Sequence, residues 1–341
     1  MLRTALSWKA RGFYGSETIR QVPTADIIVV GASAGGVEAL QQVVGGLRSD
    51  FPAAIFVVLH VPSWSVSRLP EILTRCGPLA ASHAEDGSPI VNGNIYVAPP
   101  NQHLLVSEGI IRLSAGPKEN RHRPAVNTLF RSAAVAYGPR VIGVVLTGAL
   151  DDGASGLWEI KQRGGRAIVQ EPSDALFPDM PKNALENVPV DHVVPGADIP
   201  ALLLTLAGRA IPDQENQQEA KMERHPTNLT CPECRGPISE YKKGPVSEFA
   251  CRVGHSYSPE TFLAAHAETR ERSLWAAVVA LEEGAEVARE LALRHSAGQQ
   301  RRLEQEAGGN ESAARKIREL LVLLTREHSE QLMREEAIGR P

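Results

Sequence analysis

The sequence predicts an α/β protein with a doubly wound, mostly parallel sheet and a β-hairpin insertion, followed by a small zinc-ribbon-like module and a helical hairpin. Three observations support this fold class. Apolar, β-branched runs alternate with helix-like segments from residue 25 to about residue 210. Three of the four cysteines cluster with a histidine between residues 231 and 255. From residue 259 onward the composition is almost purely that of helices.

Strands are predicted where apolar residues run together between turn-forming residues. They cover residues 27–30, 54–59, 95–98, 104–107, 110–113, 141–146, 166–170 and 192–194. The helices predicted between them cover residues 37–47, 69–75, 127–137, 154–163, 182–186 and 199–209. This alternation favours a parallel sheet. The close-set pair 104–107 and 110–113 predicts a β-hairpin inserted in that sheet.

Composition changes along the 341 residues predict five segments. We expect a flexible arm over 1–24, an α/β domain over 25–210, a polar linker over 211–229, a Cys/His module over 230–258 and a helical region over 259–341. Residues 1–24 have no clear apolar stretch of a secretory signal, so we expect a cytoplasmic protein. The net charge of −4 argues against nucleic acid as a partner, and no apolar run predicts membrane insertion.

Ser33 is the first candidate for chemistry. The run 27–30 predicts a buried strand that ends in Gly31-Ala32-Ser33-Ala34-Gly35, and a helix is predicted to follow. The Gly-x-Ser-x-Gly spelling fits a nucleophile elbow, in which a serine sits on a tight strand-to-helix turn. Backbone N–H groups near Ala34 and Gly35 then become candidates for an oxyanion hole. A phosphate-binding or helix-capping loop is the other interpretation of this turn.

His60 favours the elbow over a dinucleotide site. A dinucleotide fingerprint requires a second glycine where Ser33 stands and an acidic residue at the end of the second strand. The second predicted strand, 54–59, ends instead at His60. A histidine there can serve a serine nucleophile as its base.

An aspartate completes a possible triad. Asp151 and Asp152 follow the predicted strand 141–146, and the carboxyl ends of parallel strands share one edge of the sheet. Serine, histidine and aspartate at one edge make a catalytic triad geometrically possible, whatever their order in the chain.

Several segments together resemble the CheB family of chemotaxis protein-glutamate methylesterases. These are residues 30–36, 59–62, 96–104, 116–127, 146–148 and 152–153, and Gln170, Met180, Pro181 and Ala184 continue the match. The resemblance covers roughly residues 26–206 and implies a protein-glutamate methylesterase domain over 25–210. Asn127 stands where the family often has aspartate.

The resemblance implies a serine hydrolase acting in two-component signal transduction. Ser33 would be the nucleophile, His60 the general base and Asp152, which directly precedes a glycine, the residue that orients His60. His122 would support the cleft with Ala34 and Gly35. The implied substrate is a methylated chemoreceptor or related signalling protein, and glutamine deamidation is an implied side activity. Catalysis would need no cofactor. The receiver domain that usually precedes this domain in the family has no counterpart in residues 1–24.

The Cys/His module predicts a structural zinc site. Cys231 and Cys234 form a Cys-x-x-Cys pair, and Cys251 and His255 form a second pair. Four such ligands in two close pairs fit tetrahedral Zn²⁺, while a redox-active or idle cysteine pair is the alternative. His225 or His266 could replace one ligand.

Two other function classes stay open from the sequence. A nucleotide-dependent oxidoreductase would be recognised by NAD binding. A catalytically weak, esterase-like signalling scaffold would act through its zinc ribbon and helices. The two amphipathic C-terminal helices, with breaks expected at Gly298 and at residues 307–310, predict self-association or docking of a signalling partner.

Overall fold

The computed structural model describes residues 24–62, 64–211, 222–294 and 296–338, and it describes side chains as far as residue 324. The predicted arm over 1–24 therefore lies outside the described residues, except for Thr24. No helix within the described ranges is both long and apolar enough to cross a membrane.

A parallel sheet of seven strands forms the centre of residues 24–211, which we call the α/β unit. The strand order is β3-β4-β2-β1-β7-β8-β9, and every neighbouring pair is parallel. The strands are β1 (Ile27–Ala32), β2 (Ala54–Leu59), β3 (Ala80–His83), β4 (Asn94–Val97), β7 (Val141–Val145), β8 (Arg166–Gln170) and β9 (His192–Val194). The predicted doubly wound α/β fold is confirmed.

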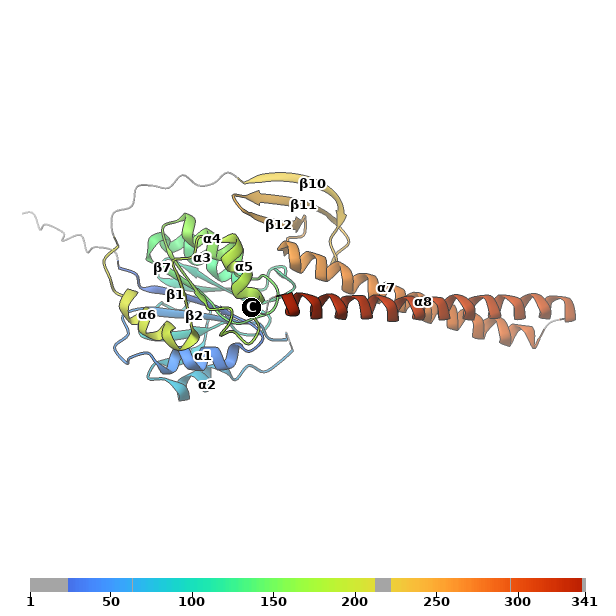
Figure 1. Cartoon of the computed structure of the whole chain (residues 1–341), viewed down its shortest axis with the longest axis horizontal. Helices are drawn as coiled ribbons and strands as arrows, with labels where there is room; N and C mark the ends of the chain where they lie inside the picture. The colour runs from blue at the N-terminus through green and yellow to red at the C-terminus, as the bar shows by residue number, and fades with distance from the viewer. Residues whose placement is uncertain (1–23, 63, 212–221, 295, 339–341) are drawn as a thin grey trace, which may run out of the picture.

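Helices cover both faces of this sheet (Figure 1). One apolar cluster packs helices α1 (Gly36–Gly45), α2 (Leu69–Cys76) and α6 (Ile199–Leu206) on one face. A second cluster packs α3 (Val126–Tyr137), α4 (Ala154–Gln162) and α5 (Asp179–Asn187) on the other. Two short 3₁₀ turns, Gly138–Arg140 and Gly196–Asp198, precede β7 and α6. Because β1, β2 and β7 are buried on both faces, they read as continuous apolar runs.

The predicted β-hairpin is present, but it lies outside the main sheet. Strands β5 (His103–Ser107) and β6 (Ile110–Ser114) form a separate two-stranded sheet, so the expectation that they join the main sheet is wrong. Their apolar face packs against α3 as part of the second cluster, and the Val106 N–H donates to Ser132 Oγ at 3.0 Å. Strand β3 was not predicted, because its four residues alternate between half-buried and exposed and include no strongly apolar run.

A four-stranded antiparallel sheet, which we call the ribbon, follows the α/β unit. Its strands are β10 (Glu223–Thr230), β11 (Pro237–Lys243), β12 (Val246–Cys251) and β13 (Ser256–Tyr257). The predicted linker over 211–229 is therefore too long at its carboxyl end, because residues from Glu223 onward pair with β11. Residues 212–221 lie outside the described part of the chain.

Two long helices, α7 (Pro259–Ala292) and α8 (Ala297–Ile338), form a hairpin that projects away from the α/β unit (Figure 1). We call the ribbon and this hairpin together the C-terminal module. The break expected at Gly298 falls within a few residues of the turn between the two helices, since α8 begins at Ala297, whereas the break expected at 307–310 is wrong because α8 runs through it. Ala307 packs against Ala285 and Ala288 of α7, and this contact keeps the segment helical despite the weak helix propensity of its glycines.

Candidate active site

Ser33 lies on the tight turn between β1 and α1. Its N–H donates to the carbonyl of Thr147 at 3.0 Å, and its own carbonyl accepts from the Gly36 N–H at 2.9 Å. Gly35 has φ of 71°, a left-handed conformation that glycine adopts without strain. The turn therefore holds the Ser33 side chain at the carboxyl edge of the sheet, where it is partly accessible.

His60 and Asp152 reach the same point from neighbouring strand ends. His60 follows β2, and its Nδ1 lies 3.1 Å from Ser33 Oγ. Its Nε2 lies 2.8 Å from Asp152 Oδ2. The side chains of His60 and Asp152 are only 5% and 3% exposed. The structure thus brings the three predicted triad residues into one chain of hydrogen bonds.

Asp152 is held by donors from three sides. Asp152 Oδ2 also accepts the Val126 N–H at 2.7 Å, while Oδ1 accepts the Asn127 N–H at 3.2 Å and Asn120 Nδ2 at 2.9 Å. Burial alone raises the pKa of this carboxyl group, but His60, the Val126 N–H and nearby charge outweigh it and lower the pKa to about 2. Asp152 is therefore ionised at neutral pH and fixed in orientation.

The ring of His122 stacks on one face of the His60 ring. The ring centroids are 3.7 Å apart and the planes differ by 5°. Burial, followed by repulsion from His60, lowers the pKa of His122 to about 3. His122 is thus neutral at pH 7 and restricts the tilt of the His60 ring.

Ala34 and Gly35 leave two backbone donors beside Ser33. Within the described part of the chain, their N–H groups donate to no protein acceptor. The Ala34 carbonyl accepts from Thr147 Oγ1 at 3.0 Å, which fixes this peptide. Two free N–H groups next to a nucleophile are the parts from which an oxyanion hole is built.

Asp151, the alternative acid in the sequence, points away from the triad. Its carboxylate accepts Ser258 Oγ at 2.6 Å, Thr261 Oγ1 at 2.6 Å and the Glu260 N–H at 3.1 Å. It therefore caps the first turn of α7.

Sequence reasoning missed three residues that shape the site. An added Cβ on Gly148 would lie 2.8 Å from the Ser33 Cβ and would also collide with Met180, so only glycine fits there. Asn127 Oδ1 accepts the Gly153 and Gly156 N–H groups at 3.1 and 2.7 Å and so supports the first turn of α4. Asn120 bridges Asp152 to Ser258. All three stand in segments that carry the family resemblance, but nothing in those segments indicates these contacts.

The four predicted metal ligands lie together in the ribbon. The ligand atoms of Cys231, Cys234, Cys251 and His255 are all within 4.8 Å of one another. The Sγ atoms of Cys234 and Cys251 are 3.6 Å apart, close to the separation of about 3.8 Å expected for two thiolates on a tetrahedral zinc. This donor set can hold a metal ion.

The two alternative ligands are elsewhere. His225 Nε2 lies near Glu223 on the exposed strand β10. His266 packs edge-on against Phe262 in α7. Neither joins the cluster of ligand atoms found in the described residues.

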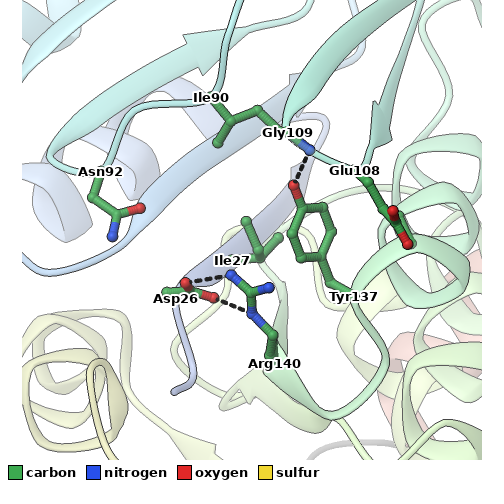
Figure 2. A pocket seen from close by; sticks show the side chains of 9 residues that line it. Asp26, Ile27, Ile90, Asn92, Glu108, Gly109, Tyr137 and Arg140 are labelled. Carbon is green, nitrogen blue, oxygen red and sulfur yellow. Dashed lines mark hydrogen bonds and ion pairs between the residues drawn. The ribbon is translucent and has the colours of Figure 1, made fainter. Parts of the chain in front are cut away.

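A cavity of about 370 Å³ lies away from the triad, at the amino end of β1 and β7. Arg140 donates two hydrogen bonds to Asp26, at 2.9 and 2.6 Å, and the Gly109 N–H donates to the Tyr137 hydroxyl at 2.8 Å (Figure 2). The hydrogen bonds of these polar groups are made with one another, so we assign the cavity a structural role and not a ligand-binding one.

Comparison with known proteins gives concordant matches. The family model described as CheB methylesterase matches residues 28–203. A relative from Leptospira interrogans, whose name includes protein-glutamate methylesterase/protein-glutamine glutaminase, is 37% identical over 57% of this chain and 98% of its own length. A relative from Anaeromyxobacter dehalogenans, named protein-glutamate methylesterase/protein-glutamine glutaminase 2, is 40% identical over 53% of each chain.

A solved structure also matches the α/β unit. The Thermotoga maritima CheB methylesterase catalytic domain has 34% identity and a TM-score of 0.52, and the match covers 54% of this chain and 100% of that one. The prediction of a carboxylic ester hydrolase is confirmed at the level of the family. The chain belongs to the CheB methylesterase family.

Proposed function

We propose that this protein hydrolyses methyl esters of glutamate side chains on methyl-accepting receptor proteins and releases methanol. Ser33 is the nucleophile, His60 the general base and Asp152 the residue that orients His60. The observation that supports this most is the hydrogen-bond chain from Ser33 Oγ through His60 to Asp152 at the carboxyl edge of the sheet.

The charge on Asp152 determines the tautomer of His60. An ionised carboxylate only accepts hydrogen bonds, so the nitrogen facing it, Nε2, must carry the proton. Nδ1 is then free to accept the Ser33 hydroxyl proton. The neutral ring of His122, stacked on His60, adds no positive charge that would oppose protonation of His60.

The reaction follows from these positions. Ser33 Oγ attacks the carbonyl carbon of the ester as His60 Nδ1 takes its proton. The Ala34 and Gly35 N–H groups stabilise the oxygen that becomes negative. His60 returns the proton to the leaving methanol, and water, activated by His60, then releases glutamate from Ser33. With glutamine as substrate, ammonia leaves instead, which gives the glutaminase reaction that the relatives' names include.

The substrate and the location belong to the same proposal. We place the reaction in the cytoplasm and in chemotaxis or a related two-component pathway, on the basis of the family and of cysteines spaced as metal ligands. Methanol release from methylated receptor, measured for wild type and for Ser33→Ala, tests it. We expect release only with Ser33 present. No release by the wild type from any receptor of the same organism would instead support a signalling scaffold.

We further propose that Cys231, Cys234, Cys251 and His255 hold a structural Zn²⁺. This proposal is supported by the position of the four donor atoms, which all lie within 4.8 Å of one another. The small apolar cluster of Ile238, Tyr257 and Phe262 packs around them. All four donors come from the protein, so the site leaves no position for substrate. Metal analysis of the purified protein, with Cys234→Ser as the comparison, tests the proposal: one zinc per chain is expected for the wild type only.

The C-terminal hairpin supports a proposal of self-association. Its inner seam consists mainly of alanines, including Ala285, Ala288 and Ala307. Val278 and Leu321 are the larger apolar side chains buried with them, while others stay outside: Trp275 is 45% exposed, and Val279 and Leu323 are also exposed. A hairpin with a thin seam and an apolar outer face is typical of a larger bundle, so we propose that a second copy covers it. Light scattering should give a dimer for wild type and a monomer for Trp275→Glu/Val279→Glu.

A further inference from the structure

The C-terminal module docks on the α/β unit directly beside the triad. Backbone groups pair the loop after β6 with the ribbon, since the Asn120 N–H donates to the Ser256 carbonyl at 2.8 Å. Arg131 of α3 donates to Glu119 and to Glu248 of β12, both at 2.8 Å. Gly244 of the ribbon turn lies against Trp158, where an added Cβ would come within 2.5 Å of the ring. The module is thus seated by close packing and by charge.

Asn120 joins the two parts at a single buried amide. Its Nδ2 donates to Asp152 Oδ1 at 2.9 Å, and its Oδ1 accepts the Ser258 N–H at 2.7 Å and lies 2.9 Å from Ser258 Oγ. The residue is 1% exposed. The amide can face only one way, because the ionised Asp152 needs a donor and the Ser258 N–H needs an acceptor.

The neighbouring aspartates extend this junction. Asp151 caps α7 through Ser258, Glu260 and Thr261, while Asp152, the next residue, orients His60. Ser258 therefore contacts both Asn120 and Asp151, and it lies three residues after His255. A displacement of the first turn of α7 would therefore move Asn120, which donates to Asp152, and Asp151, which precedes Asp152 in the chain.

We infer that Asn120 is a positioning residue for Asp152 and that Ser258, in the C-terminal module, holds Asn120 in its working orientation. The module thereby forms part of the catalytic site without touching substrate. This inference rests on the proposed serine hydrolase mechanism. It extends that mechanism by making the orientation of His60 depend on the seating of the ribbon and α7.

The first test measures how reactive Ser33 is in the full chain. A fluorophosphonate probe labels an activated serine whatever the natural substrate is. The second-order rate constant of labelling therefore reports on the arrangement of Ser33, His60 and Asp152. We expect Asn120→Ala to slow labelling about ten- to a hundredfold. Asn120→Asp, which has the same shape, should slow it more, because a second carboxylate would face Asp152.

Two further variants calibrate the effect. Ser258→Ala keeps the N–H that donates to Asn120 and removes only the hydroxyl, so we expect a decrease of roughly two- to fivefold. Asn92→Ala is the matched control, since that side chain donates to the Pro52 carbonyl on the exposed surface far from Asp152. Its labelling rate should equal that of the wild type.

A spectroscopic readout separates positioning from general destabilisation. The proton shared by His60 Nε2 and Asp152 should give a low-field ¹H resonance, assigned by its loss in Asp152→Asn. Asn120→Ala and Ser258→Ala should shift this resonance, whereas a merely structural role would lower the unfolding midpoint and leave the resonance in place.

The outcomes are distinct. A wild-type chain that is not labelled at Ser33 would contradict the proposed hydrolase mechanism itself. Labelling of Asn120→Ala at the wild-type rate, with an unshifted resonance, would overturn the inference alone. If Asn120→Ala does not fold, Ser258→Ala decides: an unchanged rate and an unchanged resonance would overturn the inference.

Discussion

The α/β unit and the C-terminal module are held together by different means. Large apolar side chains fill both faces of the seven-stranded sheet in the unit. The module has a small cluster around Cys231 and Tyr257 and an alanine seam between its helices. A core that small stabilises little on its own, so we expect the module to depend on the proposed metal and on docking. The nucleophile and base belong to the unit, while the loop of Asp152 faces the module.

The largest effect on activity is expected from a substitution in the α/β unit, at Ser33. Ser33→Ala should lower methanol release by roughly a thousandfold or more, because it removes the proposed nucleophile. Ser33 is only half-buried, so the variant should change the free energy of unfolding by less than about 1 kcal/mol. Kinetics and urea denaturation on the same preparation check both. Retention of a tenth of the activity would place the nucleophile elsewhere.

The two adjacent aspartates should separate catalysis from docking. Asp152→Asn should lower kcat by about a thousand- to ten-thousandfold, because an amide can no longer fix the His60 tautomer. Asp151→Asn should affect mainly the seating of α7 and cost about 1 kcal/mol of stability, as loss of a helix cap does. Steady-state kinetics and thermal unfolding of both variants check the contrast. Equal losses of kcat would contradict it.

Metal removal should disrupt the module before the unit. Chelation is expected to abolish hydrogen-exchange protection in β11 and β12, while β1 and β7, buried in the sheet, stay protected. Exchange followed by mass spectrometry resolves these segments. A chelated protein in which all four strands keep their protection would show that no structural metal is needed.

A smaller effect concerns acid stability. The pKa of His122 falls from 6.5 to about 3 on folding, so below pH 6.5 the unfolded chain binds a proton that the folded chain resists. His122 therefore contributes stability above pH 6.5 that is lost progressively as pH falls toward 3. His122→Phe keeps a ring on His60 without this titration. Its urea midpoint should fall less than that of wild type between pH 7 and pH 4.5; an equal fall would contradict the assignment.

The smallest effect is expected at the rim of the docking surface. Arg121 donates to Glu268 of α7 at 2.5 Å, but both side chains are partly exposed. Exposed ion pairs contribute about 0–1 kcal/mol, so Glu268→Ala should lower the unfolding midpoint only slightly and leave kcat unchanged. A tenfold fall in kcat would mean that this pair, and not Asn120, carries the coupling.

Much of the α/β unit could be predicted because its signals are local. Continuous apolar runs marked the central strands, and Ser33, His60 and Asp152 each follow such a run. Strand β3 was missed because it lies at the sheet edge with mixed burial. Gly308 and Gly309 suggested a break in α8 that packing of Ala307 overrides.

The junction with the module could not be predicted, because its contacts join residues far apart in the chain. Asn120 meets Ser258 across 138 positions and Asp152 across 32. Its left-handed φ of 49° has no signature in the surrounding residues. The choice between Asp151 and Asp152 came from the family resemblance, since either aspartate follows β7 closely enough to reach the edge.

The most direct test of the proposed mechanism is to trap the reaction on Ser33. A methylated receptor peptide is mixed with the enzyme, the reaction is quenched with acid during turnover, and the peptide that carries Ser33 is analysed by mass spectrometry. We predict an adduct on Ser33 equal in mass to the substrate minus methanol. Steady methanol release with Ser33 unmodified and the adduct on another residue would show that Ser33 is not the nucleophile.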